Sequence, residues 1–309
     1  MLLLEFALLA AGFFLLVKGA DWFVEGASGI ADKFGIPQLV IGLTIVAMGT
    51  SAPEAAVSIT AAFAGNADIS VGNVVGSNIM NVLIILGLAS AITTIAVSRT
   101  TVKYEIPFML GVTALFALLG YTGNVITFWE GIILWAVFMV YMAYMFVMIK
   151  KGEMEAEEMI INGSVPKFLF LMIVGMALII FGSDLTVDAA TELAKMFGMS
   201  ERFIGLTIVA LGTSLPELCT SVVAARKGKA DIAIGNIVGS NLFNILFVIG
   251  TSALIIPVPF APNFLIDCAI AFGAGLMLWM LVYTKNHLAR KGGLLMLLCY
   301  CGYFGYLVL

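Results

Sequence analysis

The chain has 309 residues, of which 62% are hydrophobic and 11% are charged, with a formal net charge of −4. This composition lies far outside the range of soluble domains, and the small negative charge gives no support to a nucleic-acid partner. We therefore expect an all-α integral membrane protein embedded in the lipid bilayer.

Apolar runs of about the ~20 residues that cross hydrocarbon as a helix recur along the chain. The first run lacks the basic start and the small-residue cleavage site of a signal peptide, so we interpret it as a span. Ten transmembrane helices are predicted, at about 2–28, 38–64, 69–92, 104–121, 127–149, 166–192, 202–226, 232–255, 262–284 and 290–308.

The second predicted span contains a proline and a glutamate, in "GTSAPE" from Gly49 to Glu54. Pro53 has no N–H and its ring clashes with the carbonyl four residues back, so the helix should break near Gly49 and Thr50. Carbonyls released there must face protein, water or an ion. Glu54 has no lysine or arginine at comparable depth, so we interpret it as functional rather than as half of a salt bridge.

The third predicted span carries "GNVVGSNIMN" from Gly72, in which Asn73, Ser77 and Asn81 recur every four residues and share one helix face. Such a polar stripe faces either the functional site or a neighbouring helix, to which asparagines hydrogen-bond while glycines allow close packing. The pattern leaves both interpretations open.

The second half of the chain repeats the first at a constant offset of 163 residues. "IGLTIVAMGTSAPE" from Ile41 aligns with "IGLTIVALGTSLPE" from Ile204, and "GNVVGSNIMN" aligns with "GNIVGSNLFN" from Gly235. Five helices per unit is an odd number, so the second unit enters the membrane from the opposite side. We expect two inverted five-helix repeats, residues 1–149 and 166–309, with broken helices meeting at the midplane beside the substrate site.

The acidic segment 150–165 between the two halves is interpreted as a solvated cytoplasmic linker, with a weak regulatory cation site as the alternative. Twelve of the 15 lysines and arginines fall in the connections after the first, third, fifth, seventh and ninth predicted helices. By the positive-inside rule these connections are cytoplasmic and both termini are extracellular, which fits a multi-pass protein of the plasma membrane.

Two further acidic pairs, Asp21 with Glu25 and Asp184 with Asp188, are also related by the offset and lie near predicted helix ends. We interpret them as solvated helix ends, with a cation entrance as the alternative. The broken helices supply carboxylates, carbonyls and hydroxyls, an all-oxygen set that suits a hard cation such as Ca²⁺, whereas softer metals would recruit Cys or His. The residues of this set are Thr50, Ser51 and Glu54 with Thr213, Ser214 and Glu217.

The paired motifs "GTSAPE...GNVVGSNIMN" and "GTSLPE...GNIVGSNLFN" resemble the calcium/cation antiporter superfamily, in its sodium/calcium exchanger branch, over the whole chain. The resemblance implies that Glu54 and Glu217 bind Ca²⁺ with the carbonyls of Thr50 and Thr213. It also implies Na⁺ sites formed by Ala47, Thr50, Ser51 and Ser77 with Ala210, Thr213, Ser214 and Ser240. Asn81 and Asn244 complete the candidate ligands, and Asn244 favours potassium-independent exchange because potassium-dependent relatives typically carry an aspartate there.

The expected function is secondary active exchange of Na⁺ for Ca²⁺ by alternating access, with no enzymatic activity and no organic cofactor. The resemblance implies that the first and sixth helices slide across the remaining bundle. A proton-coupled Ca²⁺ exchanger is the alternative within transporters, since carboxylates also carry protons. A cation channel is more remote because it needs no inverted repeat, and the chain shows no Gly-x-Gly-Asp motif or Ser/His pair of an intramembrane protease.

Overall fold

The protein is an all-helical bundle in the computed structural model, which describes residues 2–151, 163–199, 208 and 210–308. Seven described helices are long and apolar enough to cross a membrane, and a bent helix pair over Gln38–Phe63 is an eighth candidate span. The seven are 2–34, 69–92, 101–123, 128–150, 165–196, 230–255 and 264–283.

These eight segments match eight of the ten predicted spans. The predicted span at 202–226 falls partly on residues 200–207 and 209, which lie outside the described part of the chain. The last predicted span, 290–308, is the 19-residue helix α16 (Arg290–Val308), which is not among the seven. The all-α membrane architecture is thus confirmed, whereas the count of ten stays a prediction.

The elements of the first half follow the predicted spans, with short π-helical turns inserted in three of them. They are α1 (Leu2–Phe34), α2 (Gln38–Ile41), η1 (Gly42–Val46), α3 (Ala47–Thr50), α4 (Ala52–Phe63), α5 (Asp68–Met80), η2 (Asn81–Leu86), α6 (Gly87–Ile92), β1 (Ile95–Ala96), η3 (Thr101–Glu105), α7 (Ile106–Gly123), β2 (Val125–Ile126) and α8 (Phe128–Lys151).

The described elements of the second half reproduce much of this order. They are α9 (Val165–Met196), α11 (Ala210–Gly212), α12 (Leu215–Arg226), α13 (Ala230–Phe243), η5 (Asn244–Ile249), α14 (Gly250–Ile255), β3 (Val258–Pro259), α15 (Phe264–Tyr283), β4 (His287–Leu288) and α16. Two antiparallel two-stranded pairs, β1 with β4 and β2 with β3, join connections of one half to connections of the other.

The core lies around α5 and α13, the helices that carry the asparagine-rich motifs. Every residue of α13 from Ile232 to Phe243 is buried, and Ile79 and Ile237 are fully inaccessible. A helix that is buried all round must satisfy its polar side chains inside the protein. The motif asparagines are therefore held between helices and away from lipid.

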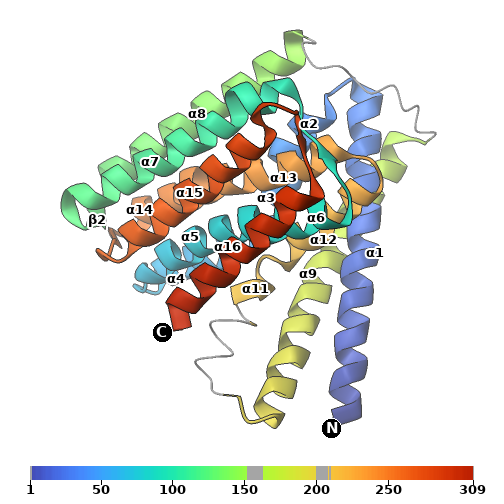
Figure 1. The fold of residues 1–309 in the computed structure, drawn as a ribbon, viewed down its shortest axis with the longest axis horizontal. Helices are drawn as coiled ribbons and strands as arrows, with labels where there is room; N and C mark the ends of the chain where they lie inside the picture. Colours follow the sequence, from blue (N-terminus) through green and yellow to red (C-terminus); the bar gives the residue numbers. More distant parts are fainter. Residues whose placement is uncertain (1, 152–162, 200–207, 209, 309) are drawn as a thin grey trace.

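Helices α1 and α9 lie side by side at one edge of the bundle (Figure 1). Small residues allow their backbones to approach closely: a Cβ on Gly19 would lie 2.7 Å from the Gly175 carbonyl oxygen, and one on Gly175 would lie 2.6 Å from the Phe23 nitrogen. Close packing through glycines is the usual way for helices to associate without a hydrophobic driving force. The two longest helices of the described residues therefore form one tightly packed pair.

Candidate cation site at the broken helices

Both "GTSxPE" motifs form a helix break, as predicted from their prolines. Helix α3 ends at Thr50, and α4 starts at Ala52 after Ser51 leaves helical geometry, with a bend of 50° between the two segments. In the second half α11 ends at Gly212 and α12 starts at Leu215. The sequence folds in this way because a proline in the first turn of the following helix needs no N–H there but cannot continue the preceding one.

The two glutamates that follow these breaks are buried and face the opposite half of the chain. Glu54 is 1% exposed and Glu217 is 0% exposed. Ser51 Oγ donates a hydrogen bond to Glu217 Oε1 at 2.7 Å, and Ser214 Oγ reaches Glu54 Oε1 at 3.4 Å. Each serine therefore reaches the glutamate of the other repeat, which brings both carboxylates into one site.

No lysine or arginine among the described residues pairs with the negative charge of this site. Neither Glu54 nor Glu217 forms an ion pair with another described residue, and the Oε2 atom of each has no hydrogen-bond partner among them. Taking an unpaired carboxylate out of water costs several kcal/mol per ion, in the effective values found for real proteins. A bound cation would balance both carboxylates and use the two free oxygens.

The hydroxyl and backbone oxygens predicted for the site lie around the same breaks. Thr50 and Ser51 are fully buried, and Ser214 is 3% exposed. Thr50 Oγ1 donates to Asn236 Oδ1 at 3.0 Å, and Ser240 Oγ approaches the Ala47 carbonyl at 3.4 Å. Thr213 lies in the turn before α12, whereas of Ala210 we describe only its place at the start of α11.

The asparagines of the companion motif hold the broken helices in place. Asn73 Nδ2 donates to the Glu54 carbonyl at 3.2 Å and to Ser58 Oγ at 2.9 Å, and Asn236 makes the same two contacts with the Glu217 carbonyl and Ser221 Oγ, at 3.5 and 2.9 Å. The contacts of the two halves are related by the same offset of 163 residues. Ser58 and Ser221 were not predicted, although both follow their glutamates by four residues and also obey the offset.

The remaining motif asparagines bond across the centre of the molecule. Asn78 and Asn241 exchange amide-to-carbonyl hydrogen bonds at 3.1 and 3.2 Å. Asn81 Nδ2 donates to Asn241 Oδ1 at 2.9 Å, and Asn244 Nδ2 donates to Asn78 Oδ1 at 3.2 Å. Interhelical bonding, one of the two interpretations left open by the sequence, therefore accounts for these amides. The Oδ1 atoms of Asn81 and Asn244 are buried without a partner among the described residues.

Ser77, the last of the predicted ligands, is 1% exposed on the same helix as Asn73. Among the described residues, no three His, Cys, Asp or Glu side chains lie close enough together to hold a metal ion. The site thus has two carboxylates and otherwise neutral oxygens. This donor set fits hard cations such as Ca²⁺ and Na⁺ better than transition metals.

A cavity of about 610 Å³ lies beside the breaks, between α9, α4 and the turn that follows α11. Its lining includes Pro53 and Thr213 as well as Asp184 and Asp188, whose side chains are exposed. Ser183 Oγ in the wall of the cavity donates a hydrogen bond to the Gly212 carbonyl at 2.9 Å. In a continuous helix this carbonyl would accept from the N–H of residue 216, which Pro216 lacks. An acidic opening therefore leads from the surface towards the released backbone.

Known proteins resemble the chain over almost its full length. The family described as "Sodium/calcium exchanger protein" matches residues 4–147 and 167–309. "Sodium/calcium exchanger MaX1" of Methanosarcina acetivorans is 30% identical and 98% of each chain is covered, and "Inner membrane protein YrbG" of Escherichia coli is 40% identical over 83% of this chain and 81% of that protein.

A solved structure shares the fold as well. The sodium-calcium exchanger NCX_Mj, soaked without Na⁺ and Ca²⁺, superposes with a TM-score of 0.87 at 32% identity, covering 99% of this chain and 100% of that one. A family match across both halves and a common fold at this identity agree with the apolar helices and the paired motifs. The chain is a multi-pass membrane protein and belongs to the sodium/calcium exchanger family.

Proposed function

We propose that the protein exchanges Na⁺ for Ca²⁺ across the membrane through the site at the two broken helices. The observation that carries this proposal is the pair of buried carboxylates, Glu54 and Glu217, each bonded to a serine of the other half and each with one free oxygen. Membership of the sodium/calcium exchanger family supports the same assignment of ions. Both ions are transported substrates and the chemistry needs no organic cofactor.

Calcium would be held by both glutamates and by the backbone carbonyls of Thr50 and Thr213. Two carboxylates balance the charge of Ca²⁺, which accepts six to eight oxygens in flexible geometry. Sodium would occupy flanking positions around the same carboxylates. The proposed Na⁺ ligands are Ala47, Thr50, Ser51 and Ser77 with Ala210, Thr213, Ser214 and Ser240, and Asn81 and Asn244 close the site through their free Oδ1 atoms.

The architecture that we propose is ten transmembrane helices in two inverted repeats, residues 1–149 and 166–309, joined by the linker 150–165. Hydrogen bonds that recur at an offset of 163 residues support the repeat, as do the cross-pairing strands. The lysine and arginine distribution supports a plasma-membrane protein with both termini outside. In this orientation the Asp184 cavity opens to the extracellular side.

Shared ligands make the exchange obligatory, because the same two glutamates bind either Ca²⁺ or Na⁺ and cannot serve both at once. Alternating access then requires the α1–α9 pair to move relative to the bundle that carries the breaks. If three Na⁺ move per Ca²⁺, as is usual in the family, one net charge crosses per cycle. Each cycle would then be driven by about 2.3 kcal/mol per 100 mV of membrane potential.

The test is ⁴⁵Ca²⁺ uptake into Na⁺-loaded proteoliposomes, with and without an outward Na⁺ gradient. We expect uptake that requires the gradient, is abolished in Glu54→Gln, and is unchanged in Glu192→Gln, a control whose exposed carboxylate pairs with Lys195 on the surface. Uptake driven by a pH gradient and indifferent to Na⁺ would overturn the proposal in favour of proton coupling. Flux without any counter-gradient would instead indicate a channel.

A further inference from the structure

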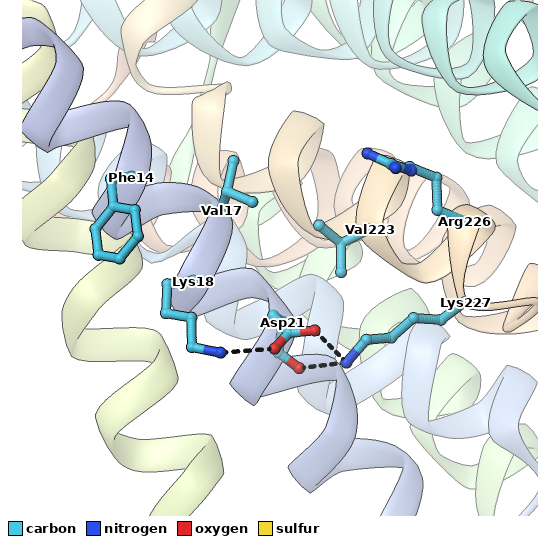
Figure 2. A pocket seen from close by; sticks show the side chains of 7 residues that line it. All are labelled: Phe14, Val17, Lys18, Asp21, Val223, Arg226 and Lys227. Atoms are coloured by element: carbon cyan, nitrogen blue, oxygen red, sulfur yellow. Dashed lines mark hydrogen bonds and ion pairs between the residues drawn. The ribbon is translucent and has the colours of Figure 1, made fainter.

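The α1 helix is tied to the end of α12 by a single lysine. Lys227 Nζ forms an ion pair with the Asp21 carboxylate and donates to the Asp21 backbone carbonyl at 2.9 Å. Lys18, one turn earlier on α1, approaches the same carboxylate at 3.3 Å. Figure 2 shows the two lysines reaching Asp21 from opposite sides, in a pocket of about 450 Å³ between the helices.

This pocket differs from the cavity on the opposite side of the site. The offset of 163 residues relates Asp21 to Asp184, and Asp184 forms no ion pair with another described residue. The Asp184 cavity includes residues of the breaks in its lining, whereas the Asp21 pocket ends at Asp21 and Val223 and includes none. The offset relates Lys227 to Ala64, which is uncharged. The side of the Asp184 cavity, which reaches the breaks, therefore has no counterpart of the lysine that pairs with Asp21.

The contacts between Lys227 and Asp21 join the α1–α9 pair to α12, and these two parts must separate for the site to open on the Asp21 side. Asp21 belongs to the α1–α9 pair, and Lys227 directly follows α12, the helix that carries Glu217. A second ion pair nearby, Lys167 with Glu25 at 3.8 Å, lies within the α1–α9 pair. Only the first of these two ion pairs would break if that pair of helices moved as a unit against α12.

We propose that Lys227 acts as a latch, which holds α1 against α12 and keeps the site closed on the Asp21 side while the Asp184 cavity is open. This inference rests on the proposed exchange cycle, since a latch has a role only if the site opens alternately to both sides. Lys227 is a positioning residue: it contacts no proposed ion ligand and acts through the equilibrium between the two open states. Breaking the ion pair therefore favours opening on the Asp21 side.

The chain contains a natural reporter for this opening. Cys219 on α12 is the repeat counterpart of Ala56, which lines the Asp184 cavity. It lies one helical turn from Val223 and is only partly exposed. Replacing the other three cysteines by serine leaves Cys219 as the single thiol, and its rate of reaction with a water-soluble maleimide then measures access from the Asp21 side.

We expect Lys227→Ala to raise the Cys219 labelling rate about two- to five-fold, the range set by an exposed ion pair. Asp21→Asn should raise it by less, because Lys227 can still donate to the backbone carbonyl of residue 21. The double variant should label no faster than Lys227→Ala, because Lys227→Ala already removes both contacts between this lysine and residue 21. Lys227→Arg, which keeps a positive charge and N–H donors for the carboxylate and the backbone carbonyl of Asp21, should label as slowly as the wild type. Lys167→Ala is the matched control, and it should leave the rate unchanged.

Equal labelling in Lys227→Ala and wild type would overturn the latch, as would the same increase in Lys167→Ala, which would indicate general loosening. Thermal unfolding of each variant separates loosening from a shifted equilibrium. The two proposals fail differently: absent Na⁺-dependent Ca²⁺ uptake in the wild type would refute the exchange function. Normal Na⁺-dependent uptake, together with a Cys219 labelling rate that is the same in Lys227→Ala and in the wild type, would refute only the latch.

Discussion

Replacing Glu217 by glutamine removes one of two buried negative charges while keeping the side-chain volume and an oxygen that accepts from Ser51. Removing one partner from a buried charge pair costs about 3 to 5 kcal/mol. If Ca²⁺ is the missing partner, that cost is a loss of about two to four orders of magnitude in Ca²⁺ affinity. The same change removes an unpaired charge from the ion-free protein, which should therefore become more stable.

The assay is thermal unfolding of the purified protein with and without Ca²⁺. At 100 times its Kd, Ca²⁺ should stabilise the wild type by about 2.7 kcal/mol. The same concentration should stabilise Glu217→Gln by at most about 0.4 kcal/mol, because it is then no more than equal to the weakened Kd. The ion-free variant should unfold at a higher temperature than the ion-free wild type. Glu192→Gln, which removes an exposed carboxylate, should behave as the wild type in both conditions.

Two results would refute this reasoning. Stabilisation of Glu217→Gln by Ca²⁺ to the same extent as the wild type would show that the carboxylate is not a ligand. Ion-free Glu217→Gln that is less stable than the ion-free wild type would show that the buried charge already has a partner that we have not identified.

Three further predictions concern the site and the contact between α1 and α9. Asn73→Ala removes the amide that holds the Glu54 carbonyl and should destabilise the protein by about 1 to 3 kcal/mol in chemical or thermal unfolding. Gly175→Ala should cost about 1 to 3 kcal/mol and slow exchange because its Cβ would meet the α1 backbone, whereas Gly111→Ala, which faces open space, should leave ⁴⁵Ca²⁺ uptake unchanged. Because position 244 holds Asn244, replacing choline by K⁺ should not alter Na⁺-driven uptake.

The helix breaks and the position of a glutamate directly after each of them could be predicted from the sequence because their signals are local and occur twice. A proline beside a glutamate within an apolar run has few explanations, and the constant offset of 163 residues relates both halves without any structure. The structure confirms the breaks at Ser51 and Ser214 and places both glutamates in one buried site.

What the sequence did not predict depends on contacts between distant segments. The mutual bonds of Asn78 and Asn241 and the Lys227–Asp21 pair join residues more than 160 positions apart, for which spacing gives no signal. The π-helical turns that begin at Asn81 and Asn244 also went unpredicted, since their register depends on how α5 and α13 pack. Once one of these turns is known, the offset of 163 residues predicts the position of the other, but the sequence predicts neither turn by itself.

The central claim is that one site serves both ions, and equilibrium binding of ⁴⁵Ca²⁺ to the purified protein tests it most directly. Sodium would replace choline at constant ionic strength, and bound Ca²⁺ would be measured at each step. The account predicts that Na⁺ displaces Ca²⁺ completely and with a steepness above one, because several Na⁺ share the ligands of Glu54 and Glu217. Calcium binding that persists at saturating Na⁺, in protein that still catalyses exchange, would contradict it by requiring separate sites.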